Sequence, residues 1–183
     1  MKLRLFILCL LVAVAGSVSG QHLTMKNYQT KITHRLSLIH IAKHPYCDKD
    51  PITNLDWREY LFWLEQTYGK SSEQYRAALP DEEVLRQQMP DSLVWYYLHH
   101  PMHNNSIVLG VSPEQARAYC QWRTDRVAEQ ILLHLKILPK DHPIASFSLA
   151  EYDNPKKLKF LYFFLPQEDM ETRYGFFCFA EWR

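Results

Sequence analysis

A long helix with a well-marked start constrains this chain more than any other feature. Ser112, Pro113 and Gln115 supply a capping side chain, a proline at the first helical position and an amide that completes a capping box. Apolar side chains then recur at helical spacing, and Pro139 is the next residue that breaks a helix. The sequence therefore predicts a helix over residues 113–137 that ends before Pro139.

A second helix start lies in the first half of the chain. Thr53 offers a capping side chain and Asp56 an acid three residues later. Apolar residues from Trp57 onward fall at helical spacing, and Gly69 is suited to end the helix. We expect a helix from about residue 54 to residue 68.

The remaining apolar segments are short and rich in aromatic and β-branched residues, which is typical of strands. Residues 36–41, 93–98, 160–165 and 175–179 are predicted as strands, the first with a short buried segment as its alternative. Residues 70–90 are polar, and we expect them to form a surface segment with one short helix. Residues 99–106 are expected to form a loop. The fold class is therefore α+β, with two main helices and short strands.

The amino terminus has the pattern of an export signal. Lys2 and Arg4 precede an apolar run, and small residues lead to a cleavage site before Gln21. The run is shorter than the roughly 20 apolar residues of a membrane-spanning helix. We expect residues 1–20 to be removed, a single domain over residues 21–183 in the periplasm or outside the cell, and no stable membrane span in it.

Composition excludes some classes of function. The 183 residues carry 21 Lys and Arg against 20 Asp and Glu, whereas a nucleic-acid-binding domain normally has a basic excess that meets the phosphates. The five tryptophans and eleven tyrosines suit a loop-rich fold pinned by large side chains, and alternatively a recognition surface.

Three cysteines remain after the signal, Cys47, Cys120 and Cys178. Export places them where disulfides persist, so the odd number predicts one bridge and one leftover thiol. Spacing alone leaves the pairing open.

Two segments resemble the formylglycine-generating-enzyme (sulfatase-modifying factor) superfamily, and in detail its branch of gliding-motility lipoproteins. Residues 51–60 read PITNLDWREY, which is similar to the pattern (E/P)-V-T-N-x-x-Y-x-x-F. Residues 108–126 read VLGVSPEQARAYCQWRTDR, which is similar to V-V-G-V-S-W-x-Q-A-x-A-Y-C-x-W-R-T-D-R. The resemblance is strongest over residues 46–137 and thin beyond them, where GFFC at residues 175–178 is similar to a terminal G-F-R-C.

The resemblance implies an abbreviated C-type-lectin-like domain. It also implies that Cys120 and Cys178 form a disulfide, because family members join the corresponding cysteines. The enzymes of this superfamily hold copper between two nearby cysteines late in the chain, and this sequence has no such pair. We therefore expect no cofactor and a non-catalytic, structural or partner-binding role at the bacterial envelope. Its partner would be an envelope protein, with gliding motility or secretion as the implied setting.

The alternative is a metal-dependent oxidoreductase of the same superfamily, in which iron-dependent members use a histidine-rich site. His40, His44 and Cys47 are the candidate ligands here, although Pro45 interrupts the segment. His99, His100 and His103 form a second cluster that could hold zinc if an acid joined it. Glu168, Asp169 and Glu171 could provide acid–base chemistry, but a solvated turn is the simpler interpretation.

Overall fold

The computed structural model describes residues 25–40, 46–142, 147–166 and 172–183, and these form an α+β fold. The α-helices are α2 (Met25–Arg35), α3 (Asn54–Tyr68), α4 (Glu73–Ala77), α5 (Glu82–Arg86), α6 (Asp91–His99) and α7 (Pro113–His134). The strands are β1 (Leu38–Ile39), β2 (Tyr46–Asp48), β3 (Leu161–Phe164) and β4 (Phe179–Trp182), with 3-10 turns η1 (Pro101–His103), η2 (Leu149–Glu151) and η3 (Thr172–Tyr174). The predicted signal peptide lies outside the described residues.

Both predicted helix starts are confirmed. Ser112 and Thr53 cap α7 and α3, each within a complete capping box, and α3 ends at Gly69 as expected. The predicted end of the long helix is wrong by a few residues, because α7 stops at His134 rather than near Ile137. Lys136 adopts a left-handed conformation with φ 57°, and the Ile137 N–H bonds to the Leu132 carbonyl, which closes the helix before Pro139 is reached.

The strand predicted at residues 93–98 is wrong, because this aromatic run lies inside helix α6. Val94 and Leu98 are four residues apart and are the two buried members of the helix. They pack with Leu85 of α5 and with Leu109. A helix therefore buries its apolar stripe here, and tertiary packing outweighs the strand preference of the neighbouring aromatics.

Other boundaries also differ from the prediction. The terminal strand begins at Phe179 rather than at Gly175, and the surface segment at residues 70–90 holds two short helices, α4 and α5, instead of one. The segment predicted at residues 36–41 contributes strand β1 at Leu38–Ile39, preceded by a helix, α2, that the sequence analysis did not identify. Strand β3 lies within the predicted residues 160–165.

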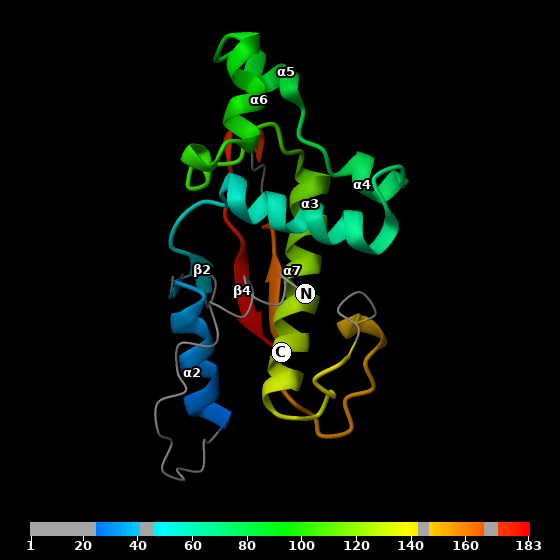
Figure 1. Cartoon of the computed structure of the whole chain (residues 1–183). Coiled ribbons are helices and arrows are strands. Elements are labelled where there is room, and N and C mark those ends of the chain that lie inside the picture. The colour runs from blue at the N-terminus through cyan, green and yellow to red at the C-terminus, as the bar shows by residue number, and fades with distance from the viewer. Residues whose placement is uncertain (1–24, 41–45, 143–146, 167–171) are drawn as a thin grey trace.

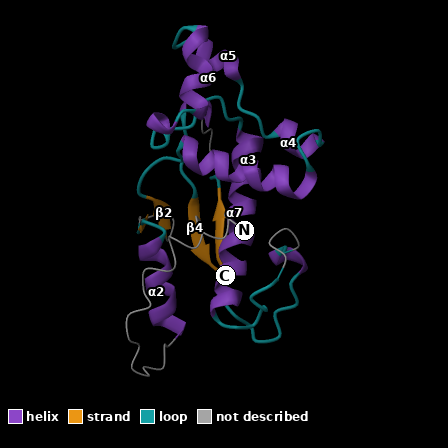
Figure 2. Ribbon diagram, viewed as in Figure 1, coloured by secondary structure: helices purple, strands orange, loops and turns teal. Residues whose placement is uncertain are grey.

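The strands form one antiparallel sheet in the order β1-β2-β4-β3. Figure 1 shows α7 running beside β3 and β4, α3 crossing near their upper end, and α5 and α6 projecting beyond the sheet. Figure 2 shows that the strands occupy only the middle of the molecule and that helices and loops make up the rest. None of the helices among the described residues has the length and apolar character needed to cross a membrane.

The main core lies between α3, α7 and the strands. Trp57 of α3 is 1% exposed and stacks on Tyr119 of α7 with ring centroids 5.4 Å apart. Phe176 meets both rings edge-on, and the Trp57 indole N–H donates to the Ala78 carbonyl. These contacts join the two predicted helices to the carboxy-terminal segment, as expected of a loop-rich fold held by large aromatic side chains.

Gly110 attaches the projecting α5–α6 unit to the core. Its φ is +76°, and a Cβ at this position would lie 2.3 Å from the carbonyl oxygen of Asp81. The Asp81 N–H donates to the Gly110 carbonyl at 2.7 Å, so the two backbones touch directly. Only glycine combines this conformation with this close approach.

Candidate functional site

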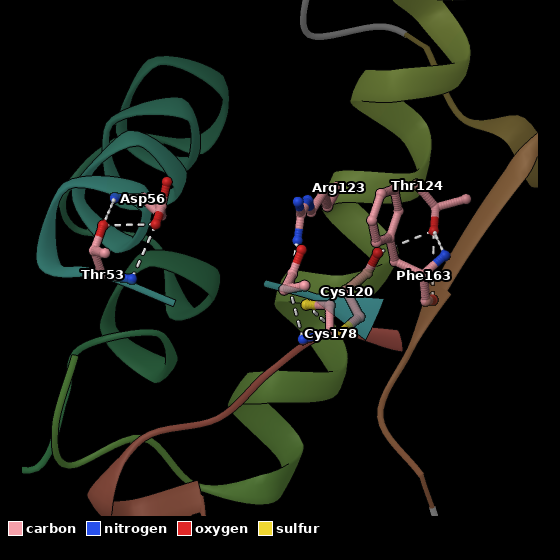
Figure 3. A network of polar contacts seen from close by, with 8 residues as sticks. Thr53, Asp56, Cys120, Arg123, Thr124, Phe163 and Cys178 are labelled. Atoms are coloured by element: carbon pink, nitrogen blue, oxygen red, sulfur yellow. Dashed lines mark hydrogen bonds and ion pairs between the residues drawn. The ribbon is translucent and has the colours of Figure 1, made fainter. Parts of the chain in front are cut away.

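The long helix carries a polar network at its middle, where the family-like motif WRTDR lies. Arg123 forms an ion pair with Asp48 of β2, with Nη1 and Oδ2 2.7 Å apart. The same Asp48 oxygen accepts the Cys178 backbone N–H at 2.9 Å. Figure 3 shows Arg123 next to Cys120 and Cys178, with Thr53 and Asp56 of the α3 cap standing apart. The network joins α7, β2 and the segment before β4.

The next three residues of the motif also bind other segments. The Thr124 hydroxyl accepts the Phe163 N–H of β3 at 2.8 Å. Asp125 accepts the Leu149 N–H at 2.9 Å, and Arg126 donates to the Phe147 carbonyl at 2.6 Å. Four consecutive polar side chains therefore hold three parts of the fold against α7: β2, β3 and the segment at residues 147–149.

The two cysteines that the resemblance pairs lie together. The Sγ atoms of Cys120 and Cys178 are 2.9 Å apart, and both residues are at most 1% exposed. Burial and the contact with Cys120 hold the pKa of the Cys178 thiol well above its ordinary value. Catalytic cysteines have lowered pKa values, so this environment favours a structural pair over a nucleophile. The disulfide itself stays a prediction.

The first group of candidate metal ligands is not brought together by the described residues. His40 is exposed beyond β1, and its ring meets Tyr46 edge-on at 5.7 Å. Cys47 is buried in β2, where burial and the charge of Asp48 raise the pKa of its thiol. A thiolate ligand must lose its proton, so this environment opposes metal binding by Cys47. His44 lies outside the described residues.

The second histidine cluster is spread over separate aromatic contacts. His99 stacks on Trp95 with centroids 5.0 Å apart, and His100 stacks on Tyr96 at 4.1 Å. The His103 Nδ1 lies 3.2 Å from the Ser106 hydroxyl. Across the described ranges, no three His, Cys, Asp or Glu side chains gather closely enough to hold a metal ion. The acids Glu168, Asp169 and Glu171 lie outside those ranges.

An exposed aromatic surface on α6 and η1 is the feature that the sequence analysis missed. We call it the α6 face and define it as Trp95, Tyr96, His99 and Met102. Trp95 and Met102 expose 65% and 73% of their surface, more than any other exposed large hydrophobic residue described. The Tyr96 hydroxyl lies 3.9 Å from the Met102 sulfur, which joins the turn to the helix. Large exposed apolar surface of this kind marks interaction sites.

Helix α3 fixes the α6 face in position. Asn54, which is 2% exposed, donates from its side-chain amide to the carbonyls of Tyr97 and His103 at 2.9 and 3.3 Å. Arg58 donates to the His99 carbonyl at 2.5 Å. The face is thus presented on a rigid support, and Asn54 of the family-like segment holds it there. A helical interpretation of residues 93–98 would have revealed it, because Val94 and Leu98 then form the buried stripe and Trp95 lies at its edge, outside that stripe.

A buried carboxylate lies near the far end of α7. Glu129 is 1% exposed and pairs with Arg126 at 2.9 Å, while His142 lies 4.0 Å from its other oxygen. Burial raises the pKa of Glu129 to about 7, although Arg126 acts in the opposite direction. Glu129 is far along α7 from the α6 face, so we treat it as part of the scaffold.

Comparisons with known proteins return no match: no family model, no curated protein and no solved structure is similar to this chain.

Proposed function

We propose that the chain is an exported, non-catalytic domain with a structural or partner-binding role at the bacterial envelope. The proposal includes a C-type-lectin-like fold of the sulfatase-modifying-factor type. The gliding-motility and secretion machinery is the partner class that the sequence resemblance implies.

The α6 face is the observation that carries this proposal. Trp95 and Met102 expose most of their apolar surface while Asn54 and Arg58 hold the backbone beneath them. Exposed tryptophan costs solubility in a free monomer, and tryptophan is enriched among the residues that dominate binding energy at protein interfaces. A rigid face of this composition suits recognition of another protein.

The network on α7 supports the non-catalytic part of the proposal. Arg123, Thr124, Asp125 and Arg126 each make bonds that hold the fold together. The thiols of Cys47 and Cys178 have raised pKa values, which disfavours both nucleophilic attack and thiolate coordination.

Photo-cross-linking in the native host tests the proposal. A photoreactive phenylalanine analogue replaces Trp95 in one strain and Phe62 in a control strain, since Phe62 is 39% exposed on α3, away from the face. We expect an adduct with an envelope protein from position 95 alone, and its loss when Met102→Ser is added. Equal labelling from both positions, or none from position 95, would contradict a binding role for this face.

A further inference from the structure

The two ends of the molecule differ in charge. Between residues 81 and 111 the chain has four carboxylates, Asp81, Glu82, Glu83 and Asp91, and one arginine, Arg86. Asp91 is 82% exposed and precedes Trp95 by one helical turn, so it borders the α6 face. Arg86 is paired with Glu82, Glu83 and Asp91, and the α5–α6 end keeps an acidic excess around its aromatic surface.

The opposite end presents a basic turn. Lys156, Lys157 and Lys159 are exposed, and residues 154–160 contain no acid, although Glu151 and Asp153 precede them. Figure 1 shows this segment, coloured orange, at the lower right, while α5 and α6 stand at the top. The two charged surfaces therefore face away from each other on one molecule.

The basic turn is built to hold its shape. The Asn154 side chain accepts the Leu158 N–H at 2.9 Å and donates to the Leu158 carbonyl at 2.8 Å. The Lys157 N–H bonds to the Asn154 carbonyl, and Lys157 has a φ of 50°, which a lysine adopts only when its surroundings impose it. The lysines thus stand on a preorganised turn, which lowers the entropic cost of binding.

From these observations we infer that the α6 face binds the basic turn of a second copy of this chain, so that molecules associate head to tail. His99 stacks on one face of the Trp95 ring, so a lysine ammonium of the second copy would lie over the opposite face, where cation–π attraction acts, with a second lysine within reach of Asp91. Because the two surfaces are different and lie at opposite ends, the contact is heterologous and leaves one free head and one free tail. Repetition builds an open chain of molecules. The inference deepens the proposed structural role and rests on it.

Sedimentation velocity of the purified exported chain tests the inference. At low ionic strength we expect species larger than the monomer whose share grows with concentration, and we expect them to dissociate at about 0.5 M salt, where exposed charges are screened. A head variant, Asp91→Lys with Trp95→Ala, and a tail variant, Lys156→Glu with Lys157→Glu, should each be monomeric. Controls at exposed positions elsewhere, Lys49→Glu and Phe62→Ala, should associate like the wild type.

Mixing the two defective variants gives the sharpest result. The head variant keeps an intact tail and the tail variant keeps an intact head, so the mixture should form dimers of one molecule of each and nothing longer. A wild-type chain that stays monomeric at every concentration, or a mixture that stays monomeric, overturns the inference. A monomeric wild type that still cross-links from position 95 to a different envelope protein would refute self-association and leave the proposed function intact. A wild type that neither associates nor cross-links from position 95 would refute the self-association and the proposed function together.

Discussion

Arg123 of α7 and Asp48 of β2 form an ion pair 2.7 Å long, with 16% and 6% of their side chains exposed. Asp48 also accepts the Cys178 N–H, so one carboxylate links the long helix to two neighbouring segments. A buried charge that loses its partner is costly, which makes this pair a direct probe of the scaffold.

Asp48→Ala should destabilise the fold by about 3–5 kcal/mol, because it leaves the Arg123 guanidinium buried without a counter-ion. Asp50→Ala, two residues away and exposed, is the matched control and should change the free energy of unfolding by less than about 0.5 kcal/mol. Urea denaturation measures both. Similar unfolding midpoints for the two variants would show that the ion pair contributes little.

The predicted disulfide can be tested by thiol labelling and mass spectrometry of the exported chain under denaturing, non-reducing conditions. We expect Cys47 to be labelled and Cys120 and Cys178 to be recovered as one linked peptide pair. The chain-entropy treatment gives such a bridge about 4 kcal/mol, so Cys120→Ala should lower stability strongly, to which lost core packing also contributes. Labelling of all three cysteines would disprove the bridge, and Cys47 in a linked peptide would disprove the pairing.

Gly110→Ala should strain the contact between the start of α5 and the core. The added methyl group meets the Asp81 carbonyl oxygen at 2.3 Å, and the backbone keeps a φ of +76°. Gly69→Ala is the control for the conformational cost alone, because its φ is +86° but nothing lies within 4 Å of the added atom. We expect a loss of about 1 kcal/mol at Gly69 and clearly more at Gly110, measured by thermal unfolding. Equal losses would mean that the close approach does not matter.

Stability should fall as the pH rises from about 5 to about 8. Burial raises the pKa of Glu129 from 4.5 to about 7 in the folded state. The folded chain therefore holds a proton that the unfolded chain releases in this range, and the stabilising contribution is full below pH 4.5 and lost as the pH rises through about 7. The charged groups that act on Glu129 are Arg126 and Asp125 on the same helix, and the His142 Nε2 lies 4.0 Å from its carboxylate.

Glu129→Gln should flatten this pH dependence. Relative to the wild type, the variant should therefore gain stability as the pH rises. The exposed Glu73→Gln is the control and should keep the wild-type profile. Denaturant midpoints across the pH range provide the measurement. An unchanged slope in Glu129→Gln would assign the pH effect to other groups.

Local signals in the sequence predicted the helices with strong caps but not the ones without them. Thr53 and Ser112 belong to capping boxes that indicate the starts of α3 and α7, and both starts were predicted correctly. Helix α6 begins at Asp91, after an N-cap residue, Pro90, that has no capping side chain, and its aromatic residues have a high strand preference, so its local signals indicated a strand. Contact of Val94 and Leu98 with Leu85 and Leu109 decides its structure, and a single sequence does not show that contact.

The candidate site was likewise predicted from the sequence only in part. The proximity of Cys120 and Cys178 was expected from the resemblance, whereas the roles of Arg123 through Arg126 depend on partners up to 75 residues away in the sequence, which only folding brings close. The α6 face was missed because its definition requires the correct secondary structure first. Of the five tryptophans, Trp57 lies in the core and Trp95 is 65% exposed, so the aromatic residues are not all used for core packing.

Complementation in the native host tests the central claim most directly. A strain lacking the chromosomal copy receives the wild type, a face variant with Trp95→Ser and Met102→Ser, or a ligand variant with His40→Ala, His44→Ala and Cys47→Ala, all at equal levels of folded exported protein. If the protein acts by binding a partner, the face variant should not reverse the defect of the deletion strain, whereas the ligand variant should reverse it as the wild type does. A face variant that reverses the defect, together with a ligand variant that does not, would contradict a binding role and favour metal-dependent chemistry.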